Sequence, residues 1–148
     1  MAFTAHETFY MLLGLATIAA VFWFNRELYQ ARLGVTALEG TYYVTAMAAL
    51  LVGWYFNIAY LREYEAEKGW WHWTTLLFVN PASASGGQDL IFANVILFPL
   101  WTIIDGRRRK MKAAWWYFPM SVFTSFAFAM ALYLAVQERQ LRRHPELG

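Results

Sequence analysis

The sequence predicts an all-α integral membrane protein: a four-helix bundle with a short interfacial or re-entrant segment between the second and third helices. Hydrophobic residues make up 59% of the 148 residues and charged residues only 15%, whereas soluble domains usually carry about 25% charged residues. Long apolar windows alternate with charged loops, and aromatic residues, at 20%, suit membrane interfaces. Four helices of about 20 residues would use most of the chain, so 1–148 is expected to be a single transmembrane domain.

The first two crossings are expected at about residues 6–25 and 40–61. The first window ends before Arg26 and has no lysine or arginine in front of it, so we interpret it as a retained helix and not as a cleaved signal peptide. The second window has Tyr42 and Tyr43 near its start and further aromatic residues toward its end, as expected for two membrane interfaces.

The stretch at about 70–79 is apolar and contains three tryptophans, but it is too short to cross a bilayer, and Asn80-Pro81 ends it. We interpret it as the interfacial or re-entrant segment. A helix at 86–105 is expected to follow. Ser85 with Gln88 three residues later fits a capping box at its start, and Pro99 should bend it.

The last crossing is expected at about 114–136, with Pro119 in its first turns. The loop 106–113 carries the densest basic cluster, so it is predicted to be cytoplasmic in a bacterial inner membrane. Four crossings would then place both termini outside. The basic flank after the first helix agrees with that orientation, but the C-terminal arginines (Arg139, Arg142 and Arg143) disagree. A crossing by 70–79 would remove this conflict.

Two acids are the candidate catalytic residues. Asp89 lies in the first turn of the expected third helix and Asp105 lies at its end. Either could be a proton donor that faces a cavity, because an ionisable group in or beside a membrane span is energetically costly and therefore suggests a function. The alternative for Asp89 is an acid at a helix N-terminus, and for Asp105 an interfacial acid paired with Arg108 or Arg109.

The candidate ligand-binding residues are polar or aromatic side chains in or beside the spans. Asn57 and Asn94 could contact a ligand or hydrogen-bond a neighbouring helix. Asn94 and Asp105 are eleven residues apart and so share a helix face. The remaining candidates are Phe98, Trp101, Arg107, Arg108 and Trp116.

Several kinds of site are not predicted. The chain has no cysteine, which excludes disulfides, Cys-ligated metals and a thiol nucleophile. His6 and His72 show no metal-ligand spacing, and we find no phosphate-binding or dinucleotide motif. No metal, cofactor or nucleic-acid partner is predicted, although a bound lipid, carotenoid or other isoprenoid is compatible with the composition.

A set of short motifs runs through the chain after the second expected crossing: Asn80-Pro81-Ala82-Ser83-Ala84, Gln88-Asp89-Leu90, Asp105-Gly106-Arg107-Arg108, Met111-Lys112, Trp116, Ala131-Leu132-Tyr133-Leu134, Glu138-Arg139 and Leu141. With these motifs the chain resembles, over roughly residues 43–143, the bacterial DUF2834 family of small membrane proteins. A Pro-Leu pair common in the family reads Met130-Ala131 here. The resemblance supports the membrane fold and identifies Asp89, Asp105, Arg107 and Arg108 as signature positions, but it implies no activity.

Two functions remain open. The first is a non-catalytic accessory subunit, or a component that binds a lipid, isoprenoid or pigment, in a bacterial membrane complex with a protein partner or a second copy. The alternative is a small membrane enzyme that acts on an isoprenoid or lipid by acid catalysis, as terpene cyclases do. Asp89 or Asp105 would supply the acid, and Phe98, Trp101 and Trp116 would stabilise a cation. A transporter is a third option, with little support.

Overall fold

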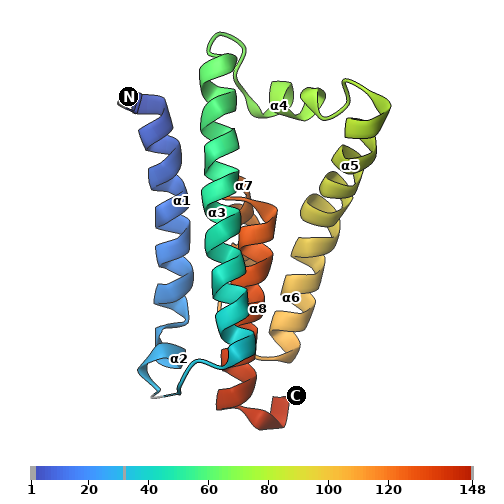
Figure 1. Cartoon of the computed structure of the whole chain (residues 1–148). Coiled ribbons are helices and arrows are strands. Elements are labelled where there is room, and N and C mark those ends of the chain that lie inside the picture. The colour runs from blue at the N-terminus through green and yellow to red at the C-terminus, as the bar shows by residue number, and fades with distance from the viewer. Residues whose placement is uncertain (1–2, 32, 148) are drawn as a thin grey trace.

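The structure, a computed structural model, describes residues 3–31 and 33–147, and this part of the chain contains helices and no strands (Figure 1). The prediction of an all-α fold is therefore confirmed. The elements in chain order are α1 (Ala5–Phe24), α2 (Arg26–Gln30), α3 (Ala37–Glu63), α4 (Trp70–Leu76), α5 (Pro81–Ile91), the π-helical η1 (Phe92–Leu97), α6 (Phe98–Arg108), the short 3₁₀ turn η2 (Ala114–Trp116), α7 (Tyr117–Phe123), α8 (Phe126–Arg143) and the 3₁₀ turn η3 (Pro145–Leu147).

Three helical segments are long and apolar enough to cross a membrane. They are α1, α3 and the continuous run of α5, η1 and α6, which spans Pro81–Arg108. Each begins at a residue whose side chain accepts hydrogen bonds from the first turn: Thr4, Thr36 and Asn80 respectively. These caps satisfy backbone donors that have no partner inside the helix.

The third of these segments begins earlier than expected. Asn80 is its N-cap and accepts from the amides of Ala82 and Ser83, with Pro81 in the first turn. The expected capping box is wrong, because Gln88 donates to the backbone oxygen of Ser85 within an established helix. An Asn-Pro pair can start a helix as well as end one, since proline is favoured at the first helical position.

Pro99 lies in the first turn of α6, directly after η1. Proline has no amide hydrogen, and its ring clashes with the carbonyl four residues earlier, here that of Val95. The π-helical turn is one of the ways in which a helix accommodates such a disruption without ending. The predicted disturbance at Pro99 therefore takes the form of a change in helix type over the six residues of η1.

The stretch expected at 70–79 contains α4, a helix of seven residues. It runs across the molecule between the ends of α3 and α5 that lie at the top of Figure 1. Trp70 and Trp71 are largely exposed on it. Its length excludes a crossing by α4 itself, and its position along a membrane surface stays a prediction.

The last apolar window does not form one crossing helix. It breaks at Thr124 and Ser125 into α7 and α8. Near its start α7 touches α1 where the indole of Trp116 donates to the carbonyl of Thr17, and near its end the hydroxyl of Tyr10 donates to the carbonyl of Val122. The chain of α7 therefore runs antiparallel to α1.

Helix α8 then returns in the opposite direction along α3. The hydroxyl of Ser125 donates to the carbonyl of Ala49, close to the middle of α3, and Arg139 pairs with Glu39 at the beginning of α3. Figure 1 shows α7 and α8 as a helical hairpin that enters the bundle from the lower end and leaves by the same end. The expected fourth span at 114–136 is not confirmed: among the described residues three helical segments are long and apolar enough to cross a membrane, and this window forms α7 and α8 instead of one long helix. The length of the uncharged window alone could not distinguish one crossing helix from two shorter helices that form a re-entrant hairpin.

Helix α8 is the centre of the core. Nine of its 18 residues are buried, and Ala129, Tyr133 and Val136 are completely inaccessible. It contacts α3 along most of its length and also packs against α2, α6 and α7. By contrast, only 22%, 11% and 17% of the apolar windows of the three long segments are buried. Their exposed apolar faces are the expected contact surface for lipid.

The re-entrant hairpin brings the basic segments to one end of the molecule. Lys112 pairs with Glu27 beside α2, and Arg143 donates to the backbone oxygen of Glu27. The loop after α6, the start of α2 and the end of α8 therefore meet, at the lower end of Figure 1. Of the described lysines and arginines, Arg62 and Lys68 lie at the opposite end. The conflict between the loop 106–113 and the C-terminal arginines disappears, because both lie on one side.

Candidate functional site

The tip of the hairpin is a polar centre inside the bundle. Ser125 has extended backbone angles and accepts from the amide of Phe128 at 3.1 Å, so it caps the N-terminus of α8. The hydroxyl of Thr124 donates back to the carbonyl of Met120 at 2.7 Å. A helix break in the middle of a bundle is stable only where such groups find partners, since lipid offers none.

The carbonyls that the break frees are bound by side chains of α1 and α3. Tyr10 donates to the carbonyl of Val122 at 3.1 Å, and Trp54 donates to that of Phe123 at 3.1 Å. Asn57 donates to the Tyr10 hydroxyl at 3.0 Å and lies 3.5 Å from the carbonyl of Thr124. Asn57, a predicted ligand residue, thus contacts the hairpin.

Two glycines let the hairpin tip approach the long helices. A Cβ atom on Gly14 of α1 would lie 2.8 Å from the carbonyl oxygen of Phe123 and 3.0 Å from Trp54. A Cβ atom on Gly53 of α3 would lie 3.0 Å from the Cβ of Ser125. Small residues allow close backbone contacts of this kind between membrane helices.

Asn94 binds the hairpin from the other side. It lies in η1, and its amide oxygen accepts from the hydroxyl of Ser121 at 2.9 Å. Ser121 also donates to the carbonyl of Phe118 at 2.7 Å, so its hydroxyl is shared between two acceptors. Asn57 and Asn94 therefore both contact the α7 part of the hairpin, which is the helix-packing alternative stated for them.

Asp105 is a junction between α6 and α8. One carboxylate oxygen accepts from the hydroxyl of Tyr133 at 2.7 Å and from the amide of Gln137 at 2.5 Å. The other accepts from Arg109 at 2.8 Å, one turn further along the chain. The expected pairing with Arg109 is present, and all three donors are protein side chains.

Asp89 is far from this junction. It lies in α5, is exposed, and its carboxylate accepts from the side chain of the neighbouring Gln88. Sixteen residues of one helical run separate it from Asp105, which corresponds to about 24 Å at 1.5 Å per residue. The two candidate acids therefore do not form one site.

The predicted aromatic residues pack against the hairpin. Phe98 is buried and meets the ring of Phe126 edge-on, with 5.3 Å between centroids. Trp101 meets Tyr133 in the same manner at 4.8 Å. The indole N–H of Trp116 donates to the carbonyl of Thr17, as described above.

A second polar cluster, which the sequence did not reveal, joins the start of α3 to the end of α8. Glu39 is completely buried and accepts from Arg139 at 2.7 Å and from Arg142 at 3.0 Å. Tyr43 also donates to Glu39, and the Tyr43 hydroxyl is 2.9 Å from that of Tyr29. Glu39 lies in the first turn of α3. Only the return of α8 brings the arginines to it.

Two cavities lie at the basic end, on either side of the loop between α6 and η2. Successive residues of this loop face different cavities: Lys110 and Lys112 line one, and Met111 and Ala113 line the other. Lys110 and Ala113 have φ angles of 53° and 51°. Such left-handed backbone is uncommon for residues other than glycine, and it turns the chain sharply at both positions.

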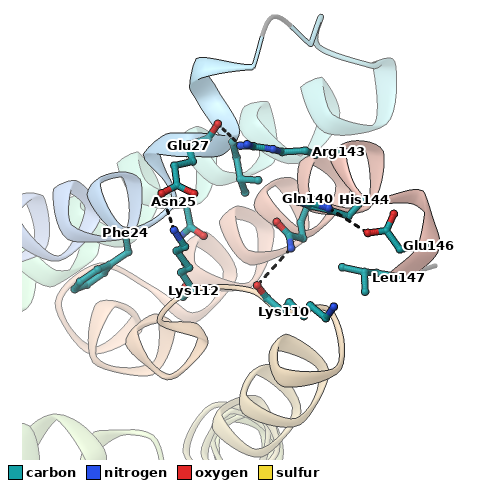
Figure 2. A pocket seen from close by; sticks show the side chains of 11 residues that line it. Phe24, Asn25, Glu27, Lys110, Lys112, Gln140, Arg143, His144, Glu146 and Leu147 are labelled. Atoms are coloured by element: carbon teal, nitrogen blue, oxygen red, sulfur yellow. Dashed lines mark hydrogen bonds and ion pairs between the residues drawn. The ribbon is translucent and has the colours of Figure 1, made fainter.

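The first cavity, of about 390 Å³, is polar (Figure 2). Its lining comes from the α1–α2 junction, the loop after α6 and the C-terminal segment: Phe24, Asn25, Glu27, Leu28, Lys110, Lys112, Gln140, Arg143, His144, Glu146 and Leu147. The hydrogen bond from Lys112 lowers the pKa of Glu27. The pKa of Glu146 is lowered too, first by a backbone hydrogen bond and also by His144. Both acids therefore stay ionised at neutral pH.

The second cavity, of about 300 Å³, is mainly apolar. It is lined by Ile103, Arg107, Met111, Ala113, Ala114 and Trp115. Arg107 is its only charged lining residue, and within the described part of the chain the Arg107 side chain makes no hydrogen bond or ion pair. Arg108, the adjacent predicted ligand residue, is exposed and lines neither cavity.

The structure thus separates the predicted site residues into three groups. Asn57, Asn94, Phe98, Trp101 and Trp116 hold the hairpin, Asp105 joins two helices, and Arg107 lines a cavity. The sequence analysis missed Tyr10, Trp54 and Thr124 at the hairpin tip and Lys110 and Trp115 at the cavities. The Thr124-Ser125 pair was a signal for the tip, since serine and threonine favour helix starts. No local signal indicated Lys110.

Comparison with known proteins gives one family. No match was found among curated proteins, and none among solved structures. A family model described as "Protein of unknown function DUF2834" matches residues 41–139, which runs from the second turn of α3 through all but the end of the re-entrant hairpin. The chain therefore belongs to the DUF2834 family.

Proposed function

We propose that this protein is a non-catalytic membrane component that binds an anionic lipid at its basic end. The observation that carries the proposal is the second cavity. There Arg107, an exposed residue whose guanidinium has no partner among the described residues, lines a cavity together with Ile103, Met111, Ala113, Ala114 and Trp115.

The chemistry of this cavity matches the boundary between a lipid headgroup and its acyl chains. A guanidinium forms paired hydrogen bonds with a phosphate, and it is more weakly hydrated than an ammonium group. Tryptophan favours the same depth in the bilayer, where its ring is apolar and its edge is wet. A volume of about 300 Å³ is at the lower end of the usual range for ligand pockets. It suits part of a lipid better than a whole one.

The orientation proposed for the chain supports this choice of ligand. We place the basic end on the cytoplasmic side of the membrane. The positive-inside rule expects basic segments on that side, and this orientation satisfies it for Arg26, the loop 106–113 and the C-terminal arginines. Each basic residue near an anionic surface contributes roughly 1 kcal/mol of attraction. The remaining crossings then place the N-terminus outside.

The contacts of the two acids favour a non-catalytic role. An acid catalyst needs a carboxyl proton that faces the substrate. Both oxygens of Asp105 accept hydrogen bonds from protein side chains, and Asp89 lies on an exposed face of α5. Neither lines one of the two cavities.

Native mass spectrometry in mild detergent tests the proposal, with phosphatidylglycerol added and phosphatidylcholine as the neutral comparison. We expect preferential retention of phosphatidylglycerol, and Arg107→Gln should weaken it roughly tenfold, because a hydrogen-bonded charged pair contributes about 1.5–3 kcal/mol. Arg108→Gln is the matched control and should have little effect. Equal loss in both variants, or no preference between the lipids, would contradict the proposal.

The same preparation tests the role as an accessory subunit. The exposed apolar faces of α1, α3, η1 and α6 can contact either lipid or a partner helix. Native purification from the source membrane should yield a complex with a second membrane protein or a second copy. A particle that contains a single copy of the chain and neither partner nor lipid would contradict both parts of the proposed function.

A further inference from the structure

The polar cavity at the basic end differs in chemistry from the cavity of Arg107 and calls for a different ligand. Figure 2 shows that three distant parts of the chain converge on it: the residues around Glu27, the loop with Lys110 and Lys112, and the C-terminal end from Gln140 onward. Most of its lining side chains are polar or charged. The cavity exists only because the hairpin returns α8 to this end.

The permanently positive side chains that line this cavity outnumber the carboxylates that line it. The ammonium of Lys112 is 2.9 Å from the Glu27 carboxylate, and His144 is 3.2 Å from that of Glu146. Arg143 donates to the backbone carbonyl of Glu27, and its charge also helps to lower the pKa of Glu27, but no carboxylate among the described residues lies at ion-pair distance from its guanidinium. The ammonium of Lys110 makes no hydrogen bond or ion pair within that same part of the chain.

The backbone holds Lys110 at the mouth of the cavity. Its left-handed conformation closes the end of α6, where its amide donates to the carbonyl of Arg107 and the amide of Met111 donates to that of Gly106 at 2.7 Å. The side chain of Gln140 donates to the carbonyl of Arg109 at 2.8 Å and lies 3.4 Å from that of Lys110. The loop is thereby attached to α8 on the cavity wall.

We infer that this cavity binds a phosphate group, with Lys110 and Arg143 as the charge-bearing contacts. A phosphate carries between one and two negative charges near pH 7 and accepts hydrogen bonds on several oxygens. A lysine and an arginine that line one cavity supply a mobile point charge and a planar fork for such a group. The group can come from free phosphate or from the headgroup of a phospholipid. The site does not depend on the proposed function, because it shares no lining residue with the cavity of Arg107.

Two measurements on the full-length protein in detergent distinguish the sources. The first follows thermal unfolding with inorganic phosphate against chloride at equal ionic strength. The second uses native mass spectrometry to compare retention of added phosphatidic acid, whose phosphate is terminal, with retention of phosphatidylglycerol, which is also anionic but whose phosphate is a diester. Stabilisation by phosphate identifies a soluble ligand, and preference for phosphatidic acid alone identifies a lipid headgroup. The absence of both overturns the inference.

Variants test the residues. Lys110→Gln and Arg143→Gln should each weaken whichever binding is observed by roughly tenfold, since each removes a charge-assisted hydrogen bond. Lys68→Gln, at the opposite end of the molecule, is the control and should bind as the parent does. Arg108→Gln, a change at a residue that lines neither cavity, should also leave this binding unchanged. Circular dichroism of each variant confirms folding, and unchanged binding in both folded variants overturns the inference.

Discussion

The re-entrant hairpin and the three long helical segments contrast in composition and in position. The long segments are the most apolar parts of the chain and yet are mostly exposed, with between 11% and 22% of their apolar windows buried. Helix α8 ends in Gln137, Glu138, Arg139, Gln140 and further arginines, and half of its residues are buried. In a water-soluble protein the apolar segments would be buried and the polar end of α8 would be exposed.

The physical reason is that lipid is as apolar as the helix surfaces it contacts. Burying one apolar helix against another gains little in a membrane, whereas a polar group gains a great deal from a protein partner. The hairpin carries the polar groups, including Thr124, Ser125 and Arg139, so it occupies the centre. The long helices supply its partners, such as Asn57 and Glu39, and face outward with the rest of their surface.

The largest expected effect concerns topology and is all-or-none. The chain has no cysteine, so a single introduced cysteine is its only thiol. Arg108→Cys and Glu146→Cys flank the hairpin and should react with a membrane-impermeant maleimide from the same side of sealed vesicles. Glu65→Cys, in the loop after α3, should react from the other side. Labelling of the first two from opposite sides would show that residues 114–136 cross the membrane, and the contrast between the hairpin and the three long segments would then not hold.

The next largest effect concerns the ion cluster that joins the two regions. Glu39→Gln leaves Arg139, which is 6% exposed, without its buried carboxylate partner. Breaking a buried ion pair in this way costs about 3–5 kcal/mol of unfolding free energy. Thermal unfolding in detergent measures the loss. Glu138→Gln is the control: Glu138 precedes Arg139 on α8, is partly exposed, and makes no hydrogen bond or ion pair among the described residues. A similar loss in both variants would mean that the cluster does not fix α8 against α3.

A smaller effect is expected at the hairpin tip. In Gly14→Ala the added methyl group would meet the carbonyl oxygen of Phe123 at 2.8 Å, and backbone cannot move aside as easily as a side chain can. We expect a loss of about 1–3 kcal/mol of unfolding free energy, as for other overpacked sites. In Gly86→Ala, on α5, the methyl group has nothing within 4 Å. That variant should be neutral or more stable by up to about 1 kcal/mol. Equal behaviour of the two would indicate that the tip does not touch α1.

The smallest effect is electrostatic and lies at the basic end, outside the membrane-spanning segments. Lys112 lowers the pKa of Glu27 in the folded protein. A lowered carboxyl pKa stabilises the fold above the ordinary value of 4.5, and this stabilisation disappears as the pH falls through the lowered value. The Tm difference between the parent and Lys112→Gln should therefore be small at pH 7 and vanish in acid. Both residues are about half exposed, which limits the effect. A difference that grows on acidification would contradict the pairing.

Much of the fold could be predicted because it follows from local composition. The charge-free windows located α1 and α3, and the tryptophan-rich stretch before Asn80 was correctly judged too short to be a helix of membrane length. The start of the third long helix was misplaced because Asn80-Pro81 is a helix breaker in one context and a cap with a first-turn proline in another. The local sequence does not distinguish them.

The candidate sites were less accessible to sequence reasoning, since their residues come from distant parts of the chain. Of the two partners considered for Asp105 in its interfacial alternative, Arg108 and Arg109, the structure pairs it with Arg109, one helical turn away. Tyr133 and Gln137 reach Asp105 only across the interface with α8. Lys110 and Arg143 share a cavity wall because α8 returns to the end from which α7 started.

The sequence by itself determined that the chain is helical, that it belongs in a membrane, and that its basic residues lie in short segments outside the apolar windows. Those properties depend on composition and on the need of every backbone group for a hydrogen-bond partner in lipid. Only the tertiary structure decided that the last window turns back at Thr124 and Ser125. That turn requires Tyr10, Trp54 and Asn57 to supply donors for the freed carbonyls, and no pattern within residues 114–136 contains them.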